Sequence, residues 1–199
     1  TSVSILTSCA DCPACWSNLL KLGILADCFR HLLEGADRHE AWRTRLVLRF
    51  AISASGSEEG RLAMIRSSLP SAHTSCSLSV VDILLRLVHS FGQDAGIRGD
   101  ALLVLRNLAF QHEGMGHFIG VSDALEVLCE EALGKSNELI IFEVRCRTYA
   151  INALWALLHN SQKIKAAFRS RGLVEHLVAA ERVFGHGACL SSLPVSRFF

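Results

Sequence analysis

Apolar residues recur at steps of three and four along most of the chain, which is the spacing of helices with one buried face. This pattern predicts helices over residues 19–33, 43–53, 80–88, 97–110, 124–133, 144–158, 164–168 and 173–184. Asp123 stands where the side chain that caps the start of the fifth helix is expected. No segment has the alternation of a credible strand, so we expect no strand and no hairpin. The pattern predicts an all-α fold.

Serine, glycine and proline mark the breaks between these helices. The predicted loops cover residues 53–60, 67–79, 93–99 and 134–137, and the serine-rich second loop, which contains Pro70, reads as an insertion. The last stretch, residues 185–199, combines Gly, Pro and Ser and is expected to be an extended tail.

The second half of the chain contains an internal repeat. When residues 150–177 are moved back by 49 positions they fall on residues 101–128. The matched pairs are Ala101 and Ala150, Leu105 and Leu154, Leu108 and Leu157, and Ile119 and Phe168. Residues 46–49 and 103–106 share a fainter match. One such unit cannot bury its apolar face alone, so the repeat predicts an irregular helical solenoid of about three to four repeats.

We expect residues 1–199 to be a single domain and a fragment of a longer chain, with a Cys-rich lead-in over 1–15 and a tail over 185–199. Half of the 199 residues are apolar, 20% are charged and the net charge is +1. This balance is globular and lacks the positive excess of a nucleic-acid-binding protein. No apolar run approaches the roughly 18 residues of a membrane span, and the first residues do not resemble a signal peptide. We therefore expect a cytoplasmic protein that binds neither nucleic acid nor membrane.

The sharpest chemical signal is the cluster of Cys9, Cys12 and Cys15. Three thiolates at this spacing could hold zinc, with Cys28 or His31 as a fourth ligand. Zinc sites usually contain two CxxC pairs, however, and here there is no second pair. The alternative is a cysteine-rich entry to a helix with reduced thiols, and we expect no cofactor and no stoichiometric zinc.

The other candidate motifs do not support an enzyme. His112 and His117 flank a glutamate, but their spacing is five, whereas a zinc-protease helix requires four. Gly114 and Gly116 indicate a turn between helices at this place. No serine lies in a Gly-x-Ser-x-Gly motif. We therefore expect a binding protein without catalytic residues.

Two polar stripes follow helical spacing. Arg38, Trp42, Arg45 and Arg49 are separated by steps of four, three and four, so they are predicted to share one face of a helix. A later stripe contains Arg145, Thr148, Asn152 and His159. Such stripes are typical either of a partner-binding surface or of an ordinary solvated helix face.

Two segments resemble the third helix of an armadillo repeat. Residues 101–110 follow the pattern Ala-Leu-x-x-Leu-x-Asn-Leu-Ala, and residues 153–157 carry its Ala-Leu-Trp-Ala-Leu form, although His159 stands where an asparagine is expected. The resemblance implies that these helices line a concave groove for an acidic or extended peptide. The implied groove residues are Arg45, Arg49, Arg106, Asn107, Arg145 and Asn152.

A closer resemblance, over residues 98–180, is to the C-terminal armadillo-like region of the rotatin family of centriole and basal-body proteins. It is carried by the segment from Arg106 to Phe110 and by Ala153 to Lys165, in which the Ala-Leu-Trp-Ala-Leu helix runs into an Asn-Ser-Gln-Lys-Ile-Lys turn. The resemblance implies a scaffold for centriole assembly and basal-body organisation, located at the centrosome, with other centriolar proteins as partners. The alternatives are a peptide-binding armadillo module of a transport or adhesion protein, and a metal-dependent regulatory domain built on the N-terminal cysteines.

Overall fold

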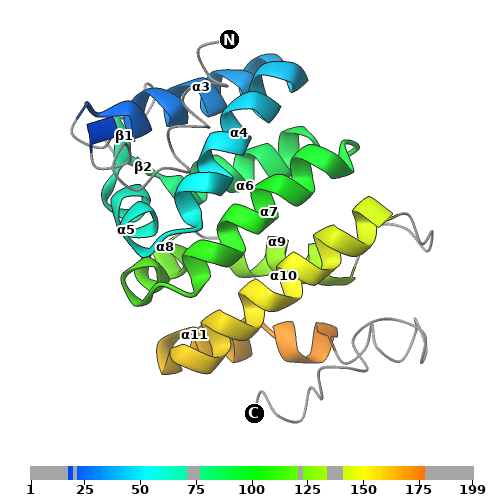
Figure 1. Cartoon of the computed structure of the whole chain (residues 1–199). Coiled ribbons are helices and arrows are strands. Elements are labelled where there is room, and N and C mark those ends of the chain that lie inside the picture. The colour runs from blue at the N-terminus through cyan, green and yellow to red at the C-terminus, as the bar shows by residue number, and fades with distance from the viewer. Residues whose placement is uncertain (1–17, 20–21, 71–76, 121–122, 134–140, 178–199) are drawn as a thin grey trace.

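The computed structural model describes residues 18–19, 22–70, 77–120, 123–133 and 141–177. Over these residues the chain is almost entirely helical, which confirms the predicted all-α class (Figure 1). The helices are α3 (Ile24–Arg38), α4 (Ala41–Ser55), α5 (Glu58–Arg66), α6 (Val80–Ser90), α7 (Ala95–Ala109), the 3-10 helix η1 (His112–Gly114), α8 (Met115–Gly120), α9 (Ala124–Leu133), α10 (Ile141–Asn160) and α11 (Gln162–Ser170). Residues 173–177 are also helical. The predicted lead-in over 1–15 and tail over 185–199 lie outside the described residues.

Three long helices, α4, α7 and α10, lie side by side with α7 in the middle (Figure 1). They run in the same direction, because contacts join their matching ends. Between α4 and α7, Arg45 pairs with Asp94 near the helix starts and Asn107 bonds Ser55 near the helix ends. Between α7 and α10, Asp100 faces Arg145 near the starts and Phe110 contacts Trp155 near the ends. A second row, formed by α3, α6 and α9, packs against the first. The short helices α5, α8 and α11 come after the long helices in the chain. The described chain thus passes three times through a second-row helix, a long helix and a short helical segment.

The core lies between the two rows of helices. The four leucines matched by the 49-residue repeat, Leu105, Leu108, Leu154 and Leu157, are all at most 4% exposed, so the prediction that they are buried is confirmed. The repeat is less regular in the short helices. Phe118, and not Ile119, shares the full burial of Phe168, because Ile119 is only partly buried. At this point the two copies are therefore offset by 50 residues instead of 49.

Local side-chain caps begin several of the helices. Ser79 and Asp82 form a reciprocal capping box at α6, and the Asp94 carboxylate accepts hydrogen bonds of 3.1 Å from the amides of Gly96 and Ile97 at α7. Ser57 and Ser161 cap α5 and α11 in the same way. Asp123 directly precedes α9, which is the place predicted for it.

The expectation of no strand and no hairpin is wrong. β1 (Ser68–Pro70) pairs with β2 (Ser77–Ser79) in antiparallel register, with Ser68 opposite Ser79 and Leu69 opposite Leu78. The strands were missed because each contains only three residues, which are too few to show an alternating pattern. Leu69, at 5% exposed, anchors the hairpin in the core. Within the serine-rich segment, residues 71–76 lie outside the description.

Two predicted helices have other boundaries, and the short helices α5, η1 and α8 were missed. Gly23 has a φ of 69°, so α3 begins at Ile24 instead of continuing from residue 19. His39 has a φ of 54° and separates α3 from α4, so Arg38 does not share a helix face with Arg45. The predicted loop over 53–60 is only a short break, because Ser57 caps a further helix, α5. Single residues in the left-handed region decide the first two boundaries, and hydrophobic spacing does not register them.

No helix among the described residues combines the length and the apolar character required to cross a bilayer. The 20-residue α10 is long enough, but it carries Glu143, Arg145 and Arg147.

Candidate protein-binding surface

Two arginines on α4 point out of the layer of long helices. Both Arg45 and Arg49 are exposed, as the sequence predicted, and Trp42 is 69% exposed at the start of the same helix. Arg45 Nη2 lies 2.7 Å from Asp94 Oδ2, and the other oxygen of Asp94 caps α7. Among the described residues no ion pair involves Arg49. The two arginines therefore differ: Arg45 ties α4 to α7 by an ion pair, whereas Arg49 forms no ion pair within the described chain and acts on Asp100 of α7 only through its charge.

On α7, Arg106 and Asn107 are both partly buried. The Asn107 amide donates a 2.9 Å hydrogen bond to Ser55 Oγ on α4, so it links two helices. The prediction that Asn107 contacts a partner stays untested, but in the unbound chain its amide is engaged with α4. The Arg106 guanidinium lies over the Phe110 ring, 5.5 Å from the ring centroid. Its Nε is buried and has no hydrogen-bond partner in the described part of the chain.

On α10, Arg145 lies between two aromatic rings, with its guanidinium carbon 6.0 Å from the Phe142 centroid and 5.8 Å from that of Tyr149. Its Nη2 is 3.5 Å from Asp100 Oδ1 on α7. Asn152, the last of the six predicted residues, is partly buried and lies on α10, seven residues after Arg145. The tertiary structure thus brings all six predicted residues onto three adjoining helices.

A depression of about 630 Å³ lies near the starts of the long helices, and its lining includes Arg45, Asp94, Asp100, Phe142 and Arg145. Burial raises the pKa of the Asp100 carboxyl, while Arg145, Arg49 and Arg45 act in the opposite direction. Each aspartate faces an arginine of a neighbouring helix. This part of the surface is consequently charge-compensated.

An aromatic cluster occupies the other end of the same surface. Phe110, which follows α7, and Trp155 on α10 are 45% and 38% exposed, with ring centroids 6.4 Å apart. Trp155 also stacks on His159, at 5.0 Å between centroids and 6° between planes. The spacing of four between Trp155 and His159 could have indicated their contact. The approach of Phe110 could not be predicted, because it depends on the register between two helices.

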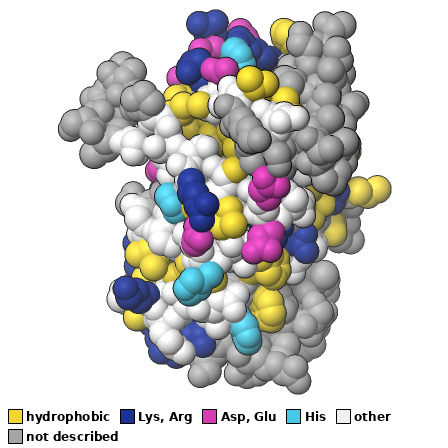
Figure 2. All heavy atoms as spheres, turned by 60° about the vertical axis from the view of Figure 1, so that its left-hand side comes forward, with side chains coloured by type: hydrophobic (Ala, Val, Ile, Leu, Met, Phe, Trp, Pro, Cys, Tyr) yellow, Lys and Arg dark blue, Asp and Glu magenta, His cyan; other side chains and the backbone are white. Residues whose placement is uncertain are grey.

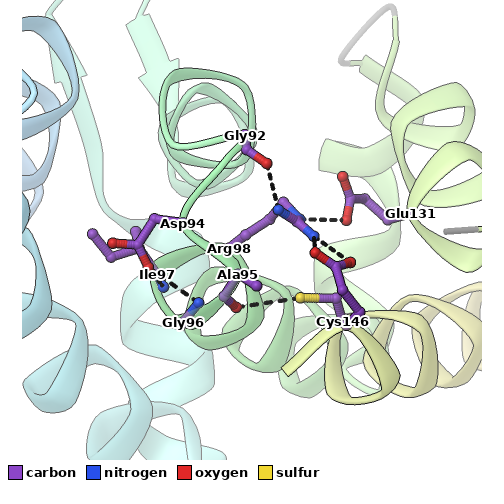
Figure 3. Close-up of polar contacts among 9 residues, drawn as sticks. Gly92, Asp94, Ala95, Gly96, Ile97, Arg98, Glu131 and Cys146 are labelled. Carbon is purple, nitrogen blue, oxygen red and sulfur yellow. Dashed lines mark hydrogen bonds and ion pairs between the residues drawn. The ribbon is translucent and has the colours of Figure 1, made fainter. Parts of the chain in front are cut away.

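A buried ion cluster holds the helices beneath this surface (Figure 3). Arg98 on α7 is 1% exposed and donates to Glu131 on α9 at 2.9 Å, to Glu143 on α10 at 2.5 Å and to the carbonyl oxygen of Gly92. One guanidinium therefore links α7 and α10 of the first row to α9 of the second row. Sequence reasoning missed this cluster, although a charged Arg98 between Ile97 and Gly99 on an apolar helix face was a usable signal.

The proposed zinc ligands are not brought together within the described residues. Cys9, Cys12 and Cys15 lie outside the description, Cys28 is buried in the core, and His31 is exposed and contacts Arg43. Burial, followed by the charge of Asp27, raises the pKa of the Cys28 thiol to about 12. In the part of the chain that the structure describes, no group of three or more His, Cys, Asp or Glu side chains could hold a metal ion.

The two-histidine motif lies on η1 and α8 and is therefore helical where a turn was expected. His112 is exposed, and Glu113 forms two-pronged contacts of 3.1–3.3 Å with Arg66 on α5. The glutamate that would act as a base in a zinc protease is thus held by an arginine.

The face shown in Figure 2 carries apolar, basic and acidic side chains interspersed, without a large field of one charge. In comparisons with known proteins, no family model, no curated protein and no solved structure matches this chain.

Proposed function

We propose that this chain is an armadillo-like repeat module that binds partner proteins on the surface of α4, α7 and α10. The observation that carries the proposal is the parallel alignment of three long helices whose outer faces bear exposed arginine and aromatic side chains. Arginine and tryptophan are the residues most enriched at the energetic centres of protein interfaces. The order of helices along the chain supports the solenoid interpretation, since each unit resembles the next in length and position.

Within this class, we place the chain in a rotatin-like scaffold that acts in centriole assembly and basal-body organisation. The support is the resemblance of two segments, Arg106 to Phe110 and Ala153 to Lys165. In the structure these segments adjoin through the Phe110–Trp155 contact. The proposed partners are other centriolar proteins, the proposed location is the cytoplasm at the centrosome and basal body, and the proposed role is non-enzymatic.

A peptide-binding armadillo module of a transport or adhesion protein is the second candidate. The exposure of Trp155 on the Ala-Leu-Trp-Ala-Leu helix favours it, because a groove-lining tryptophan can pack against an extended peptide. The bond from Asn107 to Ser55 counts against it, because that amide is no longer available to a peptide backbone.

The test is localisation of the fluorescently tagged chain in ciliated cells. We expect enrichment at centrosomes and basal bodies, lost in the Trp155→Ala variant, which removes an exposed aromatic side chain. The matched control is Leu22→Ala, which removes an exposed apolar side chain that lies outside the three long helices. A diffuse wild-type signal would exclude the centriolar role. Concentration at the nuclear envelope or cell junctions would favour the second candidate.

A further inference from the structure

The two ends of the α4–α7–α10 surface offer a partner different chemistry. At the depression, Arg45 is paired with Asp94, and Arg145 faces Asp100. A charged ligand there would have to displace an existing contact, and displacing Asp94 would also disturb the cap of α7. This end is therefore a poor place for a partner to bind.

At the end that carries the aromatic cluster, no described carboxylate forms an ion pair with the neighbouring Arg106. Phe110 and Trp155 expose 45% and 38% of their surface, although they come from different helices and lie only 6.4 Å apart. His159 covers one part of the Trp155 ring by stacking, which holds the indole in place. A rigid pair of exposed rings loses little side-chain entropy when an apolar group packs on it.

The charge next to the rings is positive. The Arg106 guanidinium lies over Phe110, its Nε lacks a hydrogen-bond partner in the described chain, and its only side-chain bond there is 3.4 Å, from Nη1 to Asn107. No carboxylate of the described residues forms an ion pair with Arg106. A carboxylate is the complementary group, because it can accept the fork of hydrogen bonds that a guanidinium donates.

From this juxtaposition we propose the chemical class of the partner, which deepens the proposed function and rests on it. The cluster of Phe110, Trp155, His159 and Arg106, named here the aromatic–arginine cluster, binds an extended acidic segment of another protein that presents an aromatic side chain. The aromatic side chain packs on Phe110 and Trp155, and a flanking carboxylate pairs with Arg106.

A single-stranded nucleic acid could also combine stacking with positive charge, but the observations favour a peptide. Asp94 and Asp100 pair with Arg45 and Arg145 on the same surface, so the long helices offer a phosphate backbone no continuous run of free positive charge. The whole chain has a net charge of only +1. A single arginine beside the rings matches a short acidic segment of a peptide.

Trp155 itself can report binding. The chain has three tryptophans, and the Trp16→Phe and Trp42→Phe changes would leave Trp155 as the single fluorophore. The probe is the blocked peptide Ser-Glu-Glu-Phe-Glu-Glu-Ser. We expect a saturable change of Trp155 fluorescence, at least about tenfold weaker binding when Lys replaces the four Glu, and a similar loss when Gly replaces Phe. Arg106→Gln should weaken binding of the probe about fivefold or more, whereas Arg86→Gln, an exposed arginine on α6, should leave binding unchanged.

Equal binding of the Glu and Lys peptides, or the absence of a saturable change, would overturn the inference. So would tighter binding of oligo-dT than of the acidic peptide. Circular dichroism spectra of the variants must match that of the parent chain. If Arg106→Gln does not fold, the comparison of the Glu, Lys and Gly peptides on the parent chain still tests the inference. A chain that reaches centrosomes but ignores the probe contradicts this inference alone. A chain that binds the probe but never reaches centrosomes contradicts the centriolar role alone.

Discussion

Arg98 and Glu143 form a two-pronged ion pair in which Arg98 Nη2 lies 2.5 Å from each carboxylate oxygen. The pair joins α7 to α10, and the same guanidinium also reaches Glu131 on α9. Arg98 is 1% and Glu131 2% exposed, so neither charge has water as an alternative partner. One buried side chain thus joins both α9 and α10 to α7, whereas the surface arginines form only exposed or half-exposed contacts.

Replacing Arg98 by methionine should lower the free energy of unfolding by about 3–5 kcal/mol, because two carboxylates would lose their buried partner. Urea unfolding measures the loss. The control Arg86→Met changes an exposed arginine and should stay within about 0.5 kcal/mol of the wild type. The triple change Arg98→Met, Glu131→Gln and Glu143→Gln should recover part of the loss. If Arg98→Met alone were as stable as the wild type, the cluster would not hold the helices together.

The core prediction concerns Leu154, which is 4% exposed on α10. Leu154→Ala should cost about 2–5 kcal/mol, since it removes buried methyl groups and leaves a cavity. Leu22→Ala is the matched control, because Leu22 is 77% exposed and its truncation should change stability by less than about 0.5 kcal/mol. Thermal or urea unfolding of both variants provides the comparison, and equal effects would show that Leu154 is not in the core.

Charge reversal should separate the two exposed arginines of α4. Arg45→Glu would place a carboxylate against Asp94, which caps α7, and should lower stability by about 0.5–1 kcal/mol. Arg49→Glu has no ion pair to break among the described residues and should cost less. The melting temperatures of the two variants at low and high salt test this difference. The order of effects should be the same at both salt concentrations but smaller at high salt, and a larger loss in Arg49→Glu would contradict the prediction.

The three described cysteines should be chemically inert in the folded chain. Burial raises the pKa of the Cys28 and Cys129 thiols to about 12 and that of Cys146 to about 11. At about pH 8 these thiols hold almost no thiolate, which is the reactive form. Iodoacetamide labelling followed by peptide mass spectrometry should therefore modify them only in urea. Rapid labelling of Cys129 without denaturant would show that its helix is not packed as described.

The Asp100 carboxyl should make stability depend on pH. Burial raises its pKa in the folded chain, so the folded state holds this proton more firmly than the unfolded chain does. The stabilisation from Asp100 is then fully present below the unfolded pKa of about 3.9 and is lost as pH rises through the folded value. Asp100→Asn lacks this loss, so its stability relative to the wild type should increase from about pH 3.5 to pH 7. Asp37→Asn, at an exposed position on α3, is the control, and a pH-independent difference for Asp100→Asn would refute the prediction.

The sequence by itself determined the longer helices and most of the core. Spacings of three and four place Leu105, Leu108, Leu154 and Leu157 on inner faces, and the 49-residue repeat relates α7 to α10, because both signals are local and are set by helix geometry. The short hairpin escaped prediction because three residues carry too little pattern. The breaks at Gly23 and His39 escaped it because they depend on single backbone angles.

Only the tertiary structure decided which polar residues are available to a partner. Arg45, Arg49, Arg106 and Asn107 look equivalent along the chain, but Arg45 meets Asp94 and Asn107 meets Ser55 across helix boundaries. Phe110 and Trp155 are 45 residues apart and adjoin only because α7 and α10 pack in one register. Helix spacing predicts which face a side chain lies on. Whether that side chain is paired or left exposed depends on the residues of the neighbouring helix, and only the packed structure brings those residues beside it.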